Sequence, residues 1–351
     1  MYWGNMNSKL ELNNFEEIRK IFDVFPNSCE KSENLAKSRN EELTKPIGSL
    51  GKLEDLAFWL SKWQGRYPAT ISRPRVSVFA GNHGVSKQGV SAFPQEVTAQ
   101  MVMNFQNGGA CVNQLCKQQD AELRVYEMGI AKPTQDFTEK PAMTEQDCVN
   151  AICYGMTTVE PGVDLLCLGE MGIANTTSGS AMAYALFGGN AIDWTGSGSG
   201  VVGDAFEKKV RVVSEGVKKH RENFTIDGKV DGLKVLQHLG GFELCAIVGA
   251  IIAGRMASIP VIIDGFTASV ACSILYSYDK TYIDHCLISH LSTEIGHVRL
   301  LDIINKEPLL NMNMRLGEAS GAVLALGILR SAINCHNGMA TFSEAMISVK
   351  N

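Results

Sequence analysis

The feature that most constrains this chain is an alternation of short β-rich runs with longer helical patterns. Such alternation is typical of a mostly parallel sheet covered by helices, because parallel strands need long crossover connections. The α/β class is therefore expected. We predict strands at five runs: "RVSVFAG" (75–81), "ELRVYEMGI" (122–130), "VDLLCLGEM" (163–171), "IPVIIDG" (259–265) and "HCLISH" (285–290).

The two ends of the chain have a different pattern. Residues 1–70 carry helical periodicity without strand signals. Together with the helices expected in 308–351, they predict a smaller helical lobe, which leaves 71–307 as a large α/β domain that carries the site. Within the C-terminal part, "MRLGEASGAVLALGILRSA" (314–332) predicts a buried helix that opens with Arg315 and Glu318. Residues three apart share a helix face, so these two charges could simply pair.

Composition excludes several classes of protein. The 351 residues are 45% hydrophobic and 20% charged with a net charge of −5, which leaves no basic field for nucleic acid. The ten cysteines stand mostly within apolar runs, as small core residues do in a reducing cytoplasm. The N-terminal segment lacks the pattern of a secretory signal, and the longest apolar segment, "LCAIVGAIIAG", is too short to span a membrane. We expect a cytoplasmic protein.

Glycine and small polar residues follow the predicted strands, where ligands bind in open parallel sheets. The most informative end is "GEMGIANTTSG" (169–179), in which Glu170 closes a buried strand. Gly172, Asn175 and Thr176 follow it as donors near an expected helix start. A carboxylate among donors indicates positive charge in the ligand, although helix capping alone would explain the threonine.

The segment "TGSGSGVVGD" contains G-x-G-x-x-G at Gly198, Gly200 and Gly203. We reject a dinucleotide site, because the preceding "GGNAIDW" is a poor buried strand and no acidic residue is well placed for a ribose. A phosphate-binding loop and a flexible turn both remain open. Lys209, two turns into the next expected helix, could reach back toward an anion, or could belong with Lys208 to a solvated face.

His83 and His297 do not indicate a metal site. The chain has seven histidines but no H-x-x-x-H or paired-cysteine spacing, so the pattern of a zinc site is missing and no metal is expected. A serine nucleophile elbow, a Walker loop and kinase motifs are absent from the sequence as well.

Several motifs, taken together, resemble one family along nearly the whole chain and in the family's order. They are "LTKPIGSLGKLEDLA" (43–57), "GNHGVSKQGVSAFPQEVTAQMV" (81–102), "GEMGIANTTSGSAM" (169–182), "HLGGFELCAIVGAIIAG" (238–254), "IPVIIDGFTASVA" (259–271) and "MRLGEASGAVLA" (314–325). The chain is similar to nicotinate-nucleotide:dimethylbenzimidazole phosphoribosyltransferases. The resemblance implies a three-layer, Rossmann-like α/β fold with a small helical lobe, a homodimer, and no metal or cofactor. Its substrates would be nicotinate mononucleotide and a benzimidazole-type base, giving α-ribazole phosphate of the cobalamin lower ligand.

The implied chemistry gives roles to the charged residues. Nicotinate leaves from a pyridinium glycoside and needs no acid, whereas the incoming benzimidazole must lose a hydrogen. The resemblance makes Glu318 the base, with burial as the means of raising its pKa from about 4.3. It places Glu170 near the ribose as an electrostatic catalyst. Arg315 would bind the phosphate and should point away from Glu318. The group implied for phosphate and ribose is Gly172, Asn175, Gly200, Lys209 and Arg315.

The positions that face the base in the family correspond to Phe93, Met101, Met171 and Leu316. All are apolar and two are flexible thioethers, so bases other than the dimethyl form, purines and phenols included, stay open. Ser197 and Ser199 receive no role. The alternative hypothesis is a catalytically silent paralogue that binds a nucleotide or base, and such a protein would be free to lose Glu318.

Overall fold

The computed structural model of the chain describes residues 12–348. Residues 1–11 and 349–351 lie outside the described residues. The expectation about a secretory signal falls largely on residues 1–11, and the two ends of the predicted helical lobe fall on residues 1–11 and 349–351.

The centre of the molecule is a six-stranded sheet in the order β2-β1-β3-β6-β7-β8, in which every pair is parallel. Its strands are β1 (Pro74–Gly81), β2 (Glu122–Met128), β3 (Leu165–Met171), β6 (Val261–Ile263), β7 (Cys286–His290) and β8 (Pro308–Leu310). Each of the five predicted runs matches one of them, with β1 starting one residue earlier than predicted, which confirms the α/β class. The edge strand β8 and a small antiparallel hairpin of β4 (Thr225–Ile226) and β5 (Lys229–Val230) were not expected.

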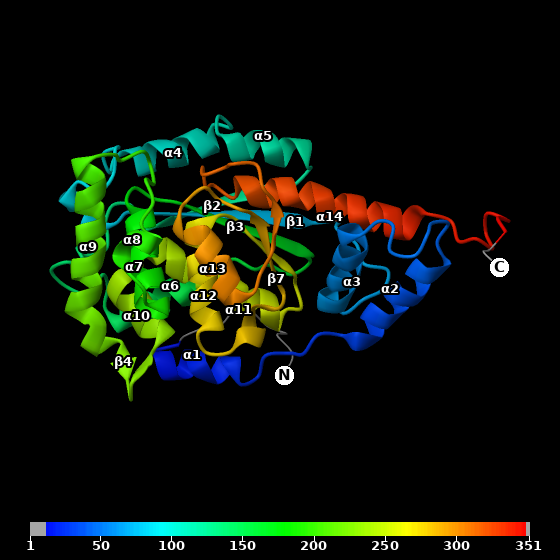
Figure 1. Ribbon diagram of the computed structural model, residues 1–351, viewed down its shortest axis with the longest axis horizontal. Coiled ribbons are helices and arrows are strands. Elements are labelled where there is room, and N and C mark those ends of the chain that lie inside the picture. Colours follow the sequence, from blue (N-terminus) through cyan, green and yellow to red (C-terminus); the bar gives the residue numbers. More distant parts are fainter. Residues whose placement is uncertain (1–11, 349–351) are drawn as a thin grey trace.

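Helices cover both faces of the sheet, so the molecule has three layers (Figure 1). One face packs against α4 (Val97–Gln106), α5 (Cys111–Gln118) and α14 (Ser320–Gly338). The opposite face packs against a larger group: α6 (Glu145–Thr157), α7 (Asn175–Phe187), α10 (Gly232–Leu239), α11 (Phe242–Met256), α12 (Phe266–Tyr276) and α13 (Gly296–Ile304). Two further helices, α8 (Ala191–Trp194) and α9 (Asp204–His220), lie beside α7.

The continuous apolar character of the strands follows from this double cover. In β3, Leu165 and Cys167 belong to the core beneath α14, whereas Leu166 and Leu168 belong to the core on the other face. Both faces of the strand are therefore buried, and no polar alternation marks it in the sequence.

The N-terminal helices are divided between the two sides of the molecule. Helices α2 (Glu30–Glu42) and α3 (Lys52–Gln64) pack on each other, and α3 packs on α14; in Figure 1 they extend with the end of α14 beyond the main body. Helix α1 (Phe15–Phe22) instead contributes its buried side chains to the core of the large body. The two-part division remains a prediction, and β8, at its proposed boundary, belongs to the main sheet.

The helix predicted over 314–332 begins later than expected. Helix α14 starts at Ser320, because Gly317, Glu318 and Ala319 have φ values of +85°, +62° and +61°. Three successive residues in the left-handed region cannot continue a right-handed helix. Glu318 therefore lies in a tight loop in front of α14.

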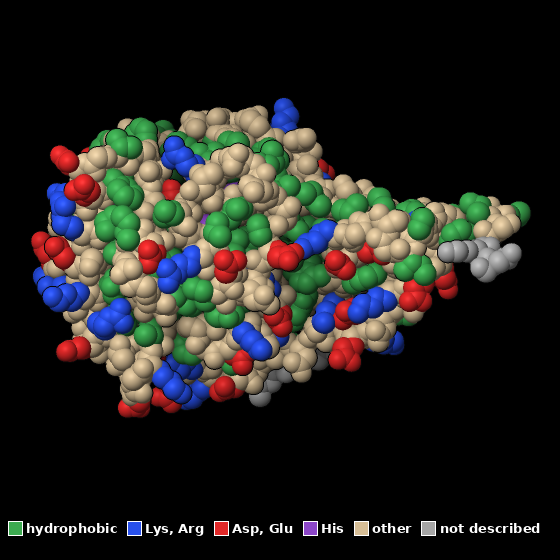
Figure 2. All heavy atoms as spheres, viewed as in Figure 1, with side chains coloured by type: hydrophobic (Ala, Val, Ile, Leu, Met, Phe, Trp, Pro, Cys, Tyr) green, Lys and Arg blue, Asp and Glu red, His purple; other side chains and the backbone are tan. Residues whose placement is uncertain are grey.

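Two expectations from composition concern cysteines and membranes. All ten cysteines are free. Cys148 and Cys245 form no disulfide bond, although their Sγ atoms lie 3.5 Å apart. No helix within residues 12–348 is long and apolar enough to cross a membrane. In the view of Figure 2, acidic and basic side chains are interspersed over the surface.

Candidate active site

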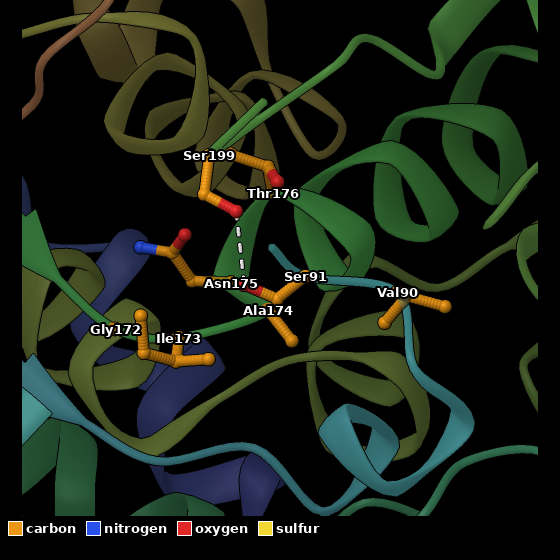
Figure 3. A pocket seen from close by; sticks show the side chains of 8 residues that line it. All are labelled: Val90, Ser91, Gly172, Ile173, Ala174, Asn175, Thr176 and Ser199. Atoms are coloured by element: carbon orange, nitrogen blue, oxygen red, sulfur yellow. Dashed lines mark hydrogen bonds between the residues drawn. The ribbon is translucent and has the colours of Figure 1, made fainter. Parts of the chain in front are cut away.

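The strand order alone indicates where a ligand would bind. The chain passes from β1 to β2 on one side and from β3 to β6 on the other, so the connections after β1 and β3 diverge. Ligands bind at such a switch point, beyond the carboxyl ends of the strands. A small hollow lies there (Figure 3). It is lined by Val90, Ser91, Gly172, Ile173, Ala174, Asn175, Thr176 and Ser199.

Glu170 lies at the end of β3, directly before this hollow. Its side chain is buried, and Asn175 Nδ2 donates a hydrogen bond to its Oε2. Burial raises the pKa of Glu170 to about 8, with the neighbouring carboxylates of Asp264 and Glu243 acting in the same direction and Asn175 opposing them. The prediction that Asn175 donates near Glu170 is confirmed.

Glu318 is brought to Glu170 by its backbone. The N–H of Glu318 donates to the carbonyl of Glu170 at 3.1 Å, so the loop before α14 is hydrogen-bonded to the end of β3. This approach requires glycine beneath it: a Cβ on Gly169 would lie 2.1 Å from the backbone nitrogen of Ala319. A Cβ on Gly317 would lie 3.4 Å from Glu170 Oε1, so the residue before Glu318 packs against the Glu170 carboxyl group.

The Glu318 carboxyl group has the properties that a base needs. It is buried, and within the described part of the chain its Oε2 has no hydrogen-bond partner. Burial raises the pKa of Glu318 to about 7. Arg315 does not form the ion pair that helical spacing made possible. Its Nη1 donates instead to the carbonyl of Gly198 at 2.8 Å, in the divergent arrangement that the resemblance implied.

Asp264 is a third buried acid that sequence reasoning missed as a site residue. It follows β6, and its Oδ1 accepts the N–H of Ala322 in the first turn of α14 at 3.1 Å. Burial raises the pKa of Asp264 to about 7. The sequence held no local signal for this position, because the contact joins residues 58 positions apart along the chain.

Lys209 reaches back from α9, as one of the two open interpretations expected. Its Nζ donates to Thr176 Oγ1 and to the carbonyl of Gly196, both at 2.9 Å. Burial lowers the pKa of Lys209 to about 8, and the carboxylate of Glu294 opposes that fall. Lys208, by contrast, is exposed. The lysine pair is therefore split between the interior and solvent.

We define residues 195–203 as the glycine loop. Gly200 has φ of +118°, and its N–H donates to the carbonyl of Ser197 at 2.9 Å, so the predicted phosphate donor is bonded within the loop in this structure. Ser199 Oγ lies 2.9 Å from Ser91 Oγ and accepts the N–H of Ala92 at 3.0 Å (Figure 3). Ser199 thus joins the glycine loop to the connection that follows β1.

The four predicted base-facing residues differ in exposure. Met101 and Met171 are half-buried and pack against the core beneath α14. Phe93 and Leu316 are 53% and 54% exposed. The structure therefore places two of these apolar side chains against one core and leaves the other two open to solvent.

The two histidines considered as metal ligands use their ring nitrogens in hydrogen bonds to other protein groups. His83 Nε2 lies 2.6 Å from Glu243 Oε1, and its Nδ1 lies 3.0 Å from Ser178 Oγ. His297 Nδ1 accepts the N–H of Ser292 at 2.9 Å. Among residues 12–348, no group of three or more His, Cys, Asp or Glu residues could hold a metal ion.

The fold and the site define a doubly wound α/β protein in which buried acids and a buried lysine meet a glycine loop, as suits group transfer from an anionic substrate. A family model described as phosphoribosyltransferase matches residues 26–347. A nicotinate-nucleotide–dimethylbenzimidazole phosphoribosyltransferase of Rhizobium rhizogenes is 47% identical over 96% of this chain and 98% of its own. One of Brucella anthropi is 47% identical over 95% of this chain and 97% of its own.

Solved structures agree with the sequence relatives. The crystal structure of CobT from Thermus thermophilus superposes with a TM-score of 0.85 at 34% identity, covering 91% of this chain and 100% of that one. The chain therefore belongs to the nicotinate-nucleotide–dimethylbenzimidazole phosphoribosyltransferase family.

Proposed function

We propose that this chain transfers phosphoribose from nicotinate mononucleotide to 5,6-dimethylbenzimidazole or a related base. The products are α-ribazole 5′-phosphate and nicotinate. The observation that carries the proposal is the Glu318 carboxyl group, which is buried, has an Oε2 without a partner among the described residues, and belongs to a residue whose N–H is bonded to the carbonyl of Glu170. A silent paralogue would have no use for such a group, whose burial is costly.

Glu318 acts as the general base. One ring nitrogen of the benzimidazole forms the bond to the anomeric carbon, and the hydrogen on the other nitrogen passes to the Glu318 carboxylate. A pKa of about 7 keeps enough of the carboxylate ionised at neutral pH and makes it a stronger base than an exposed glutamate. Because Arg315 is bonded to Gly198, it does not depress that pKa.

Glu170 acts electrostatically on the ribose. As the glycosidic bond breaks, nicotinate departs with the bonding electron pair and positive charge develops on the sugar. An ionised Glu170 stabilises that charge, and Asn175 fixes the carboxylate by a hydrogen bond. Attack from the face opposite nicotinate inverts the anomeric carbon.

The phosphate and the base occupy opposite ends of the site. Lys209, Arg315 and the backbone near Gly172 and Gly200 receive the phosphate, since guanidinium, ammonium and N–H groups suit an oxyanion. For this the Gly200 N–H must exchange its present bond to Ser197 for the phosphate. Around the base stand four apolar side chains: Phe93, Met101, Met171 and Leu316.

The enzyme is further proposed to act as a homodimer in the cytoplasm. The free cysteines support a reducing compartment. Exposed Phe93 and Leu316 are compatible with a second copy covering the base-binding end of the site.

The experiment is an incubation of the protein with nicotinate mononucleotide and dimethylbenzimidazole, in which free nicotinate and the riboside are quantified. We expect stoichiometric release of nicotinate and an α-riboside, and no release without the base. Binding of either substrate with no release over hours would overturn the proposal in favour of a silent paralogue.

A further inference from the structure

The glycine loop is held from behind by a carboxylate that the proposed chemistry does not use. Glu294 follows β7 and is 7% exposed. Its Oε1 accepts the N–H of Gly198 at 3.0 Å. On the other side of the same residue, the carbonyl of Gly198 accepts Arg315 Nη1 at 2.8 Å. The backbone of Gly198 is thus held at both its N–H and its carbonyl by charged side chains.

The loop passes between two opposite charges. A Cβ on Gly196 would lie 2.0 Å from Glu294 Oε2, and a Cβ on Gly198 would lie 2.7 Å from Lys209 Nζ. Lys209 Nζ also donates to the carbonyl of Gly196. Only glycine fits at these two positions, because any side chain there would displace the carboxylate or the ammonium group.

A buried acid beneath a loop that receives phosphate is unfavourable by itself. Glu294 repels the anion, and its Oε2 has no partner among the described residues, so its desolvation is only partly offset. It cannot be a phosphate ligand. What it does contribute is an ionised acceptor for Gly198, and hydrogen bonds to ionised acceptors are about twice as strong as neutral ones.

We propose that Glu294 is a positioning residue, which fixes the backbone of the glycine loop and the ammonium group of Lys209 for the phosphate of the nucleotide substrate. This inference rests on the proposed function. Glu294 acts through Gly198 and Lys209 and contacts neither substrate. Its loss is therefore expected to weaken phosphate binding while leaving the chemistry at Glu318 unchanged.

The test compares Glu294→Ala, Glu294→Gln and Glu294→Asp with the wild type in steady-state kinetics. We expect the Ala variant to raise KM for nicotinate mononucleotide about tenfold, the scale of one lost charge-assisted hydrogen bond. KM for dimethylbenzimidazole and kcat should stay within about twofold, because neither depends on phosphate contacts. The Gln variant keeps an acceptor for Gly198 and should recover part of the loss. Asp is one methylene too short and should resemble Ala.

Glu307→Gln is the matched control, because Glu307 is an exposed acid whose side chain pairs, among residues 12–348, with exposed Lys52. It should leave both KM values unchanged. An unchanged KM for the nucleotide in the Ala and Asp variants would overturn the inference, and so would an equal rise of KM for both substrates. If Ala does not fold, the Gln and Asp variants decide by the same comparison. If the wild type releases no nicotinate, the proposed function itself fails, whatever Glu294 does.

Discussion

Burial, rather than an unusual residue type, sets the reactivity of the acids in this site. Glu170, Asp264 and Glu318 have pKa values raised to about 8, 7 and 7, in each case chiefly because burial disfavours the charged form. Ionisation of Glu318 and Glu170 is required for the proposed step. Below about pH 8 the rate constant kcat/KM should therefore fall, as protons occupy first Glu170 and then, below about pH 7, Glu318 as well.

Asp264 offers a test of this electrostatic account at the level of one residue. Replacement by Asn removes a negative charge that helps to raise the pKa of Glu170, while its amide oxygen can still accept the N–H of Ala322. We expect the acid limb of kcat/KM to move to lower pH, with the ratio of activity at pH 6 to that at pH 8 rising about threefold. A pH–rate profile from pH 5 to 9 measures this, with exposed Asp302→Asn as control. A limb that stays in place in Asp264→Asn would contradict it.

At the residue scale, the sequence motifs identified Glu170 and Glu318 but not all the groups that these and the other buried acids contact. The prediction that Arg315 points away from Glu318 is confirmed by its bond to Gly198. Glu294 and Asp264 were missed as site residues, because their importance depends on which backbone groups lie against them. Such contacts join segments far apart along the chain, and no local pattern records them.

At the scale of elements, one close approach decides where Glu318 lies. Gly169 of β3 allows the loop before α14 to pass directly over the strand. We expect Gly169→Ala to displace this loop and to lower kcat at least a hundredfold, because a misplaced catalytic group loses most of its effect. Nicotinate release and thermal unfolding measure the change.

Gly179→Ala is the matched control for this substitution. Gly179 lies in α7 near the same site, but a Cβ there would meet nothing closer than 3.5 Å. Its activity should be close to that of the wild type, and its helix should be slightly more stable, since Ala has the higher helix propensity. Equal losses in the two variants would show that the close approach at Gly169 is not the cause.

A second contact between elements joins the two ends of the active site. Ser199 links the glycine loop to Ser91 and Ala92, one residue before Phe93. Phosphate binding at the glycine loop should therefore order Phe93, one of the proposed base-facing side chains. In wild type, ribose 5-phosphate should tighten dimethylbenzimidazole binding about fivefold, the lower end of typical coupling. Ser199→Ala should abolish that coupling.

Titration calorimetry with and without ribose 5-phosphate measures the coupling between the two ligands. Ser199→Thr keeps the hydroxyl group and should keep the coupling. Ser197→Ala should do so as well, because the structure gives the exposed Ser197 only backbone hydrogen bonds. Full coupling in Ser199→Ala would show that the link plays no part in binding.

Among the elements, long periodic segments were predictable and short or strained ones were not. All five predicted strands exist, since continuous apolar runs are buried between two helical layers. Strand β8 escaped prediction because three residues that begin with Pro308 carry no period. The start of α14 was placed too early, because the left-handed backbone at Glu318 and Ala319 is imposed by tertiary contacts and not by residue type.

In the molecule as a whole, the switch point of the sheet and the proposed catalytic residues lie at the same place. The strand order reverses between β1 and β3, and the hollow lies beyond their carboxyl ends (Figure 3). Glu170 stands at the end of β3, where its carbonyl accepts the N–H of Glu318. The sequence predicted the parallel sheet but not its strand order. The site residues were predicted from the resemblance of several motifs together, rather than from any single one, and their roles remain a proposal.

The most direct measurement is the pH dependence of nicotinate release in the wild type and in Glu318→Gln. The wild type should gain up to about a hundredfold in kcat/KM per pH unit below about pH 7, where both Glu318 and Glu170 must lose a proton, and about tenfold per unit from there to about pH 8, where only Glu170 must. Glu318→Gln should lose at least a hundredfold in kcat and should lack the part of the limb that Glu318 contributes. A Gln variant with the rate and the profile of the wild type would contradict the assignment of Glu318 as the base.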